Sequence, residues 1–242
     1  MSRILYVFPH PDDESFGPAP AIAQQLENGH EVHLLTLTKG GATKQRHKLG
    51  LNVEEMGEVR LREMIQVEKT LGLSSMEVLD LPDSGLKDIC PMEIEEVVET
   101  HIEKLRPDII VTYAVHGISG FFDHLVTHAA VKRVFCDLKQ RAAEHCPQRL
   151  ALFTLGPDSY TGDHFQLKTS PASDIDCITV VTEKQATLGK KALFCYETYL
   201  EVIEKTRIAE HTADNVHFEF FGERCDPPVS DIGMKLNAHT VS

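Results

Sequence analysis

Residues 8–14, Phe-Pro-His-Pro-Asp-Asp-Glu, constrain the fold of this chain more than any other stretch. They follow an apolar run at 4–8, Ile-Leu-Tyr-Val-Phe, which is typical of a strand buried in a parallel sheet. The two prolines stiffen the chain where it leaves this strand. Open α/β sheets bind their ligands at the carboxyl ends of strands. The sequence therefore predicts that an imidazole and three carboxylates are held at a ligand-binding edge.

A divalent metal ion would explain why this stretch is so acidic. Two adjacent carboxylates are costly to bury unless a cation compensates their charge. We therefore expect His10 and Asp13 to hold a metal ion and Asp12 to remain available as a base. The alternative is a solvated loop whose acidic side chains only cap the following helix. The imidazole between two prolines, directly after a buried strand, favours the metal site.

The rest of the chain alternates predicted strands and helices. Strands are expected at 4–8, 31–38, 76–81, 109–113, 150–155 and 175–181, and helices at about 18–28, 53–71, 93–105, 125–138 and 183–205, the last with a break near Tyr196. Gly72 is expected to end the helix that begins at Val53. Segment 44–53 is expected to be irregular, and 156–174 to be a long active-site loop. This alternation predicts an α/β fold: a doubly wound, mostly parallel, Rossmann-like sheet with helices on both faces.

Length and charge limit the organisation of the protein and its partners. For 242 residues we expect one domain over 1–242, in which 222–242 form a coil-like tail. This tail is expected to cross a neighbouring subunit, so that the protein is a homo-oligomer. The net charge of −13 argues against nucleic acid and against an anionic membrane surface as partners.

Cysteine usage and hydropathy bear on the compartment. The six cysteines form no CxxC pair, which is typical of free thiols in a reducing compartment. No apolar run approaches the roughly 18 residues of a membrane span, and the N-terminus reads as a strand rather than as a targeting leader. We therefore expect a cytoplasmic protein without a membrane partner.

Residues 10–14, His-Pro-Asp-Asp-Glu, resemble the signature of the PIG-L/LmbE-like N-deacetylases, which are zinc hydrolases acting mostly on N-acetylglucosamine conjugates. The resemblance covers residues 3–140 and is weak from 141 onward, where only 191–193 are similar to the family's last helix. It implies an LmbE-like fold, zinc-dependent N-deacetylase activity and a small-molecule amino-sugar substrate. The cofactor that it implies is Zn²⁺, with Fe²⁺ or another divalent metal in the cell as alternatives.

The third metal ligand is expected from the loop after the fourth predicted strand. A hydrolytic zinc site needs about three protein ligands and an open position for water, and this loop offers His116, His124 and His128. Residues 120–124, Gly-Phe-Phe-Asp-His, stand where the family typically has Gly-His-Pro-Asp-His, whose last histidine binds zinc. The resemblance thus implies that His124 is the third ligand. It leaves His128 behind the site or at the surface, and Asp123 is expected to be a helix N-cap.

The resemblance also implies roles for other residues. Asp12 corresponds to the general base, which takes the proton of the attacking water and later passes it to the leaving amine. Arg60, in an Arg-x-x-Glu segment, and Asp83, in an Asp-Ser-Gly turn, correspond to groups that contact sugar hydroxyls. Glu14 is expected to hold His10 or a helix-terminal amide.

Phe121 is where this chain departs from the family. The family's histidine at this position stabilises the oxyanion and assists the leaving group, whereas a phenyl ring donates no hydrogen bond. His116, earlier in the same loop, is the nearest candidate for that role. Besides an amino-sugar N-deacetylase, two alternatives remain open: a metal-dependent amidase on a non-sugar acyl amine, and a catalytically impaired binding protein that retains the metal. Phosphoryl transfer ranks lower, because the sequence has no Walker or dinucleotide fingerprint.

Overall fold

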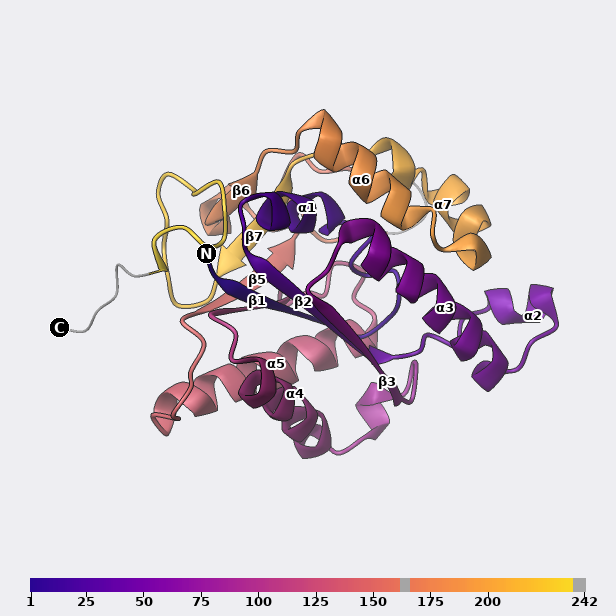
Figure 1. Ribbon diagram of the computed structural model, residues 1–242, viewed down its shortest axis with the longest axis horizontal. Coiled ribbons are helices and arrows are strands. Elements are labelled where there is room, and N and C mark those ends of the chain that lie inside the picture. The colour runs from indigo at the N-terminus through magenta and orange to yellow at the C-terminus, as the bar shows by residue number, and fades with distance from the viewer. Residues whose placement is uncertain (162–165, 237–242) are drawn as a thin grey trace.

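A seven-stranded sheet forms the centre of the protein, whose computed structural model describes residues 1–161 and 166–236 (Figure 1). The strands are β1 Arg3–Phe8, β2 Glu31–Thr38, β3 Ser75–Leu81, β4 Ile109–Tyr113, β5 Arg149–Thr154, β6 Cys177–Thr179 and β7 Val216–Phe220. Their order in the sheet is β3-β2-β1-β4-β5-β7-β6. Strands β1 to β5 run parallel, whereas β7 is antiparallel to both of its neighbours. The predicted α/β fold with a mostly parallel sheet is confirmed.

Helices connect the strands and cover both faces of the sheet. They are α1 Ala19–Glu27, α2 Gln45–Leu49, α3 Val53–Leu71, α4 Pro91–Leu105, α5 Phe122–Gln140, α6 Glu183–Leu193 and α7 Leu200–Thr206, with short 3₁₀ turns η1 Leu86–Asp88, η2 Ala172–Asp174, η3 Glu197–Tyr199 and η4 Ile208–Glu210. Figure 1 shows α1, α3 and α6 on one face and α4 and α5 on the other. In the described part of the chain, no helix is both long enough and apolar enough to cross a membrane.

Strand β1 shows how the sheet separates two apolar cores. Ile4, Tyr6 and Phe8 pack in the core that includes α1 and α3. Leu5 and Val7 point the other way and pack with α4 and α5. All five side chains are fully buried. Because both faces of the strand are covered, it reads as a continuous apolar run.

Helix α3 has the bounds that were predicted, and its ends show why. The Asn52 side chain accepts a hydrogen bond from the Glu55 amide, and the Glu55 side chain accepts one from the Asn52 amide in a capping box. Gly72 ends the helix with a left-handed φ of 75°, as expected for a glycine at this position. Helix α3 carries Arg60, which is among its buried residues.

Three details differ from the expectations. Segment 44–53 is not irregular throughout, because 45–49 form α2, which ends at Gly50 in the left-handed region. Helix α5 begins at Phe122, so Phe121 is the N-cap residue and Asp123 lies inside the first turn; the predicted Asp123 cap is wrong. Strand β7 was not predicted, and its insertion between β5 and β6 makes this end of the sheet antiparallel.

Two predicted segments extend beyond the described residues. The long loop expected at 156–174 includes 162–165, which lie outside them; what is described of it contains the short turn η2. The coil-like tail expected at 222–242 is described as far as 236. Within it, Val229 forms an isolated parallel bridge with Cys177, which ties the tail to the edge strand β6.

The strand order places the candidate site. The chain passes from β1 to β2 on one side of β1, whereas β4 lies on its other side. In open α/β sheets ligands bind at the carboxyl ends of the strands beside such a switch in order. His10 follows β1 and His124 follows β4, so both residues lie at the carboxyl ends of the strands beside this switch.

Candidate active site

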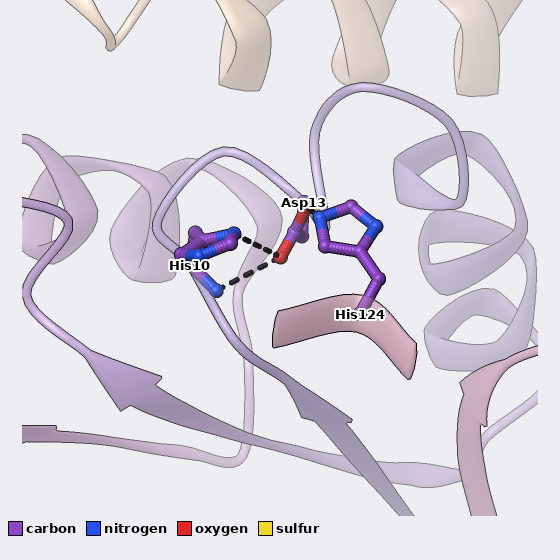
Figure 2. A group of neighbouring side chains, drawn as sticks. All are labelled: His10, Asp13 and His124. Carbon is purple, nitrogen blue, oxygen red and sulfur yellow. Dashed lines mark hydrogen bonds and ion pairs between the residues drawn. The ribbon is translucent and has the colours of Figure 1, made fainter. Parts of the chain in front are cut away.

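His10, Asp13 and His124 come together beyond the ends of β1 and β4 (Figure 2). Each offers one ligand atom, and these atoms lie within 4.8 Å of one another. Asp13 lies between the two imidazoles: its Oδ2 is 3.6 Å from His10 Nδ1 and its Oδ1 is 3.4 Å from His124 Nε2. These are the three residues that were expected to be metal ligands.

A hydrogen bond of His124 determines which of its two ring nitrogens is unprotonated and can bind a metal. Its Nδ1 lies 3.0 Å from the carbonyl oxygen of Gly117. Because a carbonyl only accepts, Nδ1 carries the proton and Nε2 is left as the ligand atom. Burial outweighs the charge of Asp13 and lowers the pKa of His124, which favours the neutral imidazole that a metal needs. The loop that supplies this carbonyl therefore sets the tautomer.

His10 is oriented from behind by a carboxylate. Its Nε2 lies 3.1 Å from Asp123 Oδ2, so Nε2 donates and Nδ1 is the nitrogen that faces Asp13. The amides of Ser84 and Leu86 in turn donate to the Asp123 carboxylate at 2.8 and 3.2 Å. A carboxylate behind a metal-binding histidine commonly fixes the ring in this way. Asp123 thus supports the site rather than capping the helix.

The charge around His10 fits a cation. Burial disfavours the charged ring, but the hydrogen bond to Asp123 and the charges of Asp13 and Asp83 outweigh it and raise the pKa of His10 to about 9. A metal ion at Nδ1 would take the place of the proton that these acidic groups stabilise there. A second possible ligand group, formed by His10 with Asp83 and Asp123, shares the same imidazole. It would use Nε2, which already donates to Asp123. The group with Asp13 and His124 is therefore the better metal site.

Tyr113, the last residue of β4, was not predicted to belong to the site. Its hydroxyl donates to Asp13 Oδ1 at 2.6 Å, and its ring stacks on His124 with centroids 4.3 Å apart and planes at 11°. Burial and the charge of Asp13 raise the pKa of Tyr113 well above its ordinary value, so it remains a donor. His128 Nδ1 bonds to the carbonyl oxygen of Tyr113 at 2.8 Å, which places His128 behind the site.

Asp12, the expected base, sits on a strained piece of backbone. Its φ is 86°, in the left-handed region that non-glycine residues seldom adopt. Its Oδ2 accepts a hydrogen bond from the Arg60 guanidinium at 2.8 Å. Burial raises the pKa of Asp12 to about 6, although the positive charge of Arg60 opposes the shift. The turn and the guanidinium together fix the carboxylate beside Asp13.

Arg60 is almost fully buried, at 1% exposure, which a helical arginine rarely is. Its guanidinium lies over the rings of Tyr196 and Tyr199, with the central carbon 5.4 and 3.9 Å from their centroids, and it also donates to the Pro11 carbonyl at 2.7 Å. A side chain at Gly40 would come within 2.9 Å of Arg60 Nε, so this glycine leaves room for the guanidinium. Among the described residues, Arg60 Nε and one terminal nitrogen have no hydrogen-bond partner.

Asp83 and Glu14 take different positions. Asp83 accepts from the Ala42 amide at 2.6 Å, and its other oxygen is 3.4 Å from His10 Nε2, so it lies at the site. Glu14 was expected to hold His10 or a helix-terminal amide. That expectation is wrong, because its Oε1 accepts from the hydroxyls of Ser15 and Tyr196, at 2.6 and 2.7 Å. Burial raises the pKa of Glu14 to about 7.

His116 makes its hydrogen bonds away from the metal group. Its Nδ1 accepts from the Ile118 amide at 3.0 Å, which leaves the proton on Nε2. That nitrogen lies 3.2 Å from Ser170 Oγ and 3.3 Å from Thr154 Oγ1. Phe121, by contrast, is 53% exposed and meets the His124 ring edge-on, with centroids 5.7 Å apart.

Comparison with known families identifies the chain. A family model described as PIG-L, GlcNAc-PI de-N-acetylase, matches residues 5–135, more than half of the 242 residues. The chain belongs to the PIG-L family. The matched region of this PIG-L protein includes His10, Asp13 and His124 and the elements that carry them.

Two curated proteins show how far the similarity extends. The N-acetylglucosaminyl-phosphatidylinositol de-N-acetylase of Bos taurus is 27% identical over 207 residues, which cover 82% of this chain and 75% of the bovine one. The 1D-myo-inositol 2-acetamido-2-deoxy-alpha-D-glucopyranoside deacetylase of Kineococcus radiotolerans is 30% identical over 158 residues, 54% of this chain and 44% of its own. The chain thus spans less than half of the bacterial relative.

Solved structures share the fold. A zinc-inhibited form of the teicoplanin deacetylase Orf2 superposes with a TM-score of 0.69 at 14% identity, over 90% of this chain and 97% of that one. GalB, a 4-carboxy-2-hydroxymuconate hydratase from Pseudomonas putida, superposes with a TM-score of 0.68 at 15% identity, over 93% and 98%. Because a deacetylase and a hydratase share this fold, function must be argued from the site.

Proposed function

We propose that this PIG-L protein is a metal-dependent N-deacetylase that removes the N-acetyl group from an amino-sugar conjugate. The observation that carries the proposal is the convergence of His10 Nδ1, His124 Nε2 and the Asp13 carboxylate beside a second carboxylate, Asp12. Membership of the PIG-L family, with the bovine relative named above, supports the amino-sugar substrate.

The donor set fits a divalent ion. Two imidazole nitrogens and a carboxylate oxygen are the ligands of many hydrolytic Zn²⁺ sites, and both histidines have the outer partners that such ligands usually have. A bound ion would polarise the amide carbonyl and make water more acidic. Zn²⁺ is our first choice and Fe²⁺ the second.

Asp12 is proposed as the general base. Arg60 holds Asp12 Oδ2, which fixes the carboxylate next to the ligand Asp13. In this position Asp12 would take a proton from the attacking water and hand it to the amide nitrogen as the carbon–nitrogen bond breaks. The buried positive charge of Arg60 favours the ionised form of Asp12 that this role requires.

Arg60 and Asp83 are proposed to bind the sugar. Asp83 lies beside His10, and Arg60 is bonded to Asp12. The two Arg60 nitrogens without a hydrogen-bond partner among the described residues are buried, so neighbouring side chains must move before a sugar hydroxyl reaches them. His116 is proposed as the donor to the oxyanion in place of a histidine at position 121. For that role its Nε2 must exchange Ser170 and Thr154 for the substrate oxygen. Catalytic hydrogen bonds often form only when the substrate binds, so the present partners of His116 do not conflict with this role.

Phe121 favours a second candidate function, a metal-retaining binding protein with impaired catalysis. A phenyl ring meets His124 where a hydrogen-bond donor would assist the reaction, and losing one oxyanion donor typically costs about 10²–10³ in kcat. Among enzyme functions, an amidase acting on a non-sugar acyl amine remains the alternative. The single domain over 1–242 and the homo-oligomer remain predictions.

Amine release from N-acetylglucosamine conjugates and from simple N-acetyl amines tests the proposal. The protein is loaded with Zn²⁺ or Fe²⁺, and a chelated sample and the His124→Ala variant serve as controls. We expect metal-dependent release from the sugar substrates and loss of metal in His124→Ala. Release from the simple amines alone would favour the amidase. Stoichiometric metal without any turnover would favour the binding protein, and full metal occupancy in His124→Ala would overturn the ligand assignment.

A further inference from the structure

Two exposed phenylalanines begin helix α5 and break the local rules of a helix start. Phe121 occupies the N-cap position without a side-chain cap, where Ser, Thr, Asp or Asn is preferred. Phe122 follows it, and the two are 53% and 65% exposed. Local rules that are broken without an evident gain in stability tend to mark functional positions.

The two phenylalanines have different contacts. Phe121 meets the ring of the candidate ligand His124 edge-on at 86°, with centroids 5.7 Å apart. Phe122 faces Lys87 instead, whose ammonium lies 5.6 Å from the ring centroid. Phe121 therefore lies next to the metal group, whereas Phe122 lies on the adjoining surface. The pair provides a test residue and a control of the same type.

The loop before α5 holds Phe121 in this place. Gly117, Ile118 and Gly120 all have positive φ, of 61°, 56° and 72°. A β-branched residue such as Ile118 seldom adopts this region, so the surrounding contacts must hold the loop in shape. Its backbone is fixed at one end by the bond from His124 to the Gly117 carbonyl. Phe121 thus sits on a constrained loop, which suits a wall of a binding site.

The groups proposed to bind the sugar lie next to His10 and Asp12, not next to His124. Asp83 is beside His10, at 3.4 Å, and Arg60 is bonded to Asp12, at 2.8 Å. Phe121 is beside His124. A substrate amide placed at the metal group with its sugar toward Asp83 and Arg60 would direct its acyl carbon chain toward His124 and Phe121.

We propose that Phe121 determines acyl specificity, and that the protein acts on amino sugars whose N-acyl group is larger than acetyl. The proposal rests on the proposed function: the amide hydrolysis and the amino sugar stay the same, and the acyl group that is removed is longer than acetyl. Phe121 packs against the carbon chain of the acyl group, and this burial adds to binding in proportion to the apolar area removed from water. The reaction is the same hydrolysis: the carbon–nitrogen bond breaks, the water oxygen bonds to the carbonyl carbon, and a carboxylic acid and a free amine leave.

The experiment compares kcat/KM of the metal-loaded protein on N-acetyl-, N-butanoyl- and N-hexanoyl-glucosamine. Full burial of one methylene corresponds to about fourfold in kcat/KM, and hexanoyl has four more methylenes than acetyl. Because the site is partly open, we expect a hexanoyl-to-acetyl ratio of at least about tenfold. Phe121→Ala should bring this ratio close to one. Phe122→Ala, which removes an equally large and similarly exposed ring, should keep it.

Several results would overturn the proposal. One is the absence of a hexanoyl preference in the unmodified protein, and another is a preference that Phe121→Ala leaves intact. A Phe121-dependent preference for N-acetylglucosamine with a hexyl aglycone, without an acyl preference, would assign the ring to the aglycone. If no substrate turns over, the proposed function fails. In that case, calorimetry measures the dissociation constants of the N-hexanoyl and N-acetyl sugars. If the Phe121 ring contacts the acyl chain, the hexanoyl sugar binds more tightly to the unmodified protein, and Phe121→Ala abolishes this difference in affinity.

Discussion

The Tyr113 hydroxyl donates a 2.6 Å hydrogen bond to Asp13 Oδ1, and the same tyrosine ring stacks on His124. One residue at the end of β4 therefore positions two of the three candidate ligands. The hydroxyl and the amide of His10 bond to different oxygens of Asp13, at 2.6 and 2.8 Å. The two hydrogen bonds together hold the Asp13 carboxylate in place between the two imidazoles.

Tyr113→Phe is expected to weaken metal binding while leaving the fold intact. The phenyl ring can still stack on His124, but Asp13 loses a donor that orients it. Loss of such outer partners typically costs about 10- to 100-fold in metal affinity. Competition with a chromophoric chelator measures the dissociation constant. Tyr6→Phe is the matched control, because this buried tyrosine bonds to Gln25 elsewhere, and equal losses in both variants would contradict the role of Tyr113.

Asp12→Asn is expected to keep the metal and lose turnover. The amide keeps the shape of the side chain, and its oxygen can still accept from Arg60, but it takes up no proton at neutral pH. General-base catalysis contributes roughly 100- to 10,000-fold, so kcat should fall by an amount in that range. Metal content and steady-state kinetics are measured on the same sample. Activity within a few-fold of the unmodified protein would mean that the base lies elsewhere.

The sequence predicted the parts of this structure that depend on local signals. Strand β4 and helix α3 have the predicted bounds, because an almost wholly apolar run at 109–113 marks the strand and a terminal glycine at position 72 marks the end of the helix. The partners of the site could not be predicted in this way. Tyr113 is 100 residues from Asp13 in the chain and Tyr196 is 182 residues from Glu14, and no local pattern encodes such contacts. Strand β7 has only five residues, and its existence depends on pairing with β5 and β6.

Arg149→Met is expected to destabilise the protein without affecting the metal. The buried guanidinium pairs with Glu223, at 2.7 Å, and donates to the carbonyls of Ile232 and Met234. Removing one partner of a buried ion pair typically costs about 3–5 kcal/mol, because the other charge is left uncompensated. Urea unfolding measures the change. Arg141→Met, in an exposed pair with Glu99, should cost at most about 1 kcal/mol, and equal effects would contradict the argument.

His116 remains the proposed donor to the oxyanion, and comparing His116→Ala with Phe121→His tests it. The proposal predicts that His116→Ala lowers kcat/KM for an N-acetyl amino sugar about a hundredfold with the metal retained, within the range for loss of one oxyanion donor. The contacts of His116 with Ser170 and Thr154 make a second outcome informative. If His116→Ala leaves kcat/KM unchanged while Phe121→His raises it tenfold or more, the donor was lost from this chain and His116 has not replaced it.

Because His116 bonds to the Ile118 amide in the loop before His124, metal content is measured in both variants. A loss of turnover that follows a loss of metal would show that His116 acts by holding the loop, which would also contradict its role as a donor.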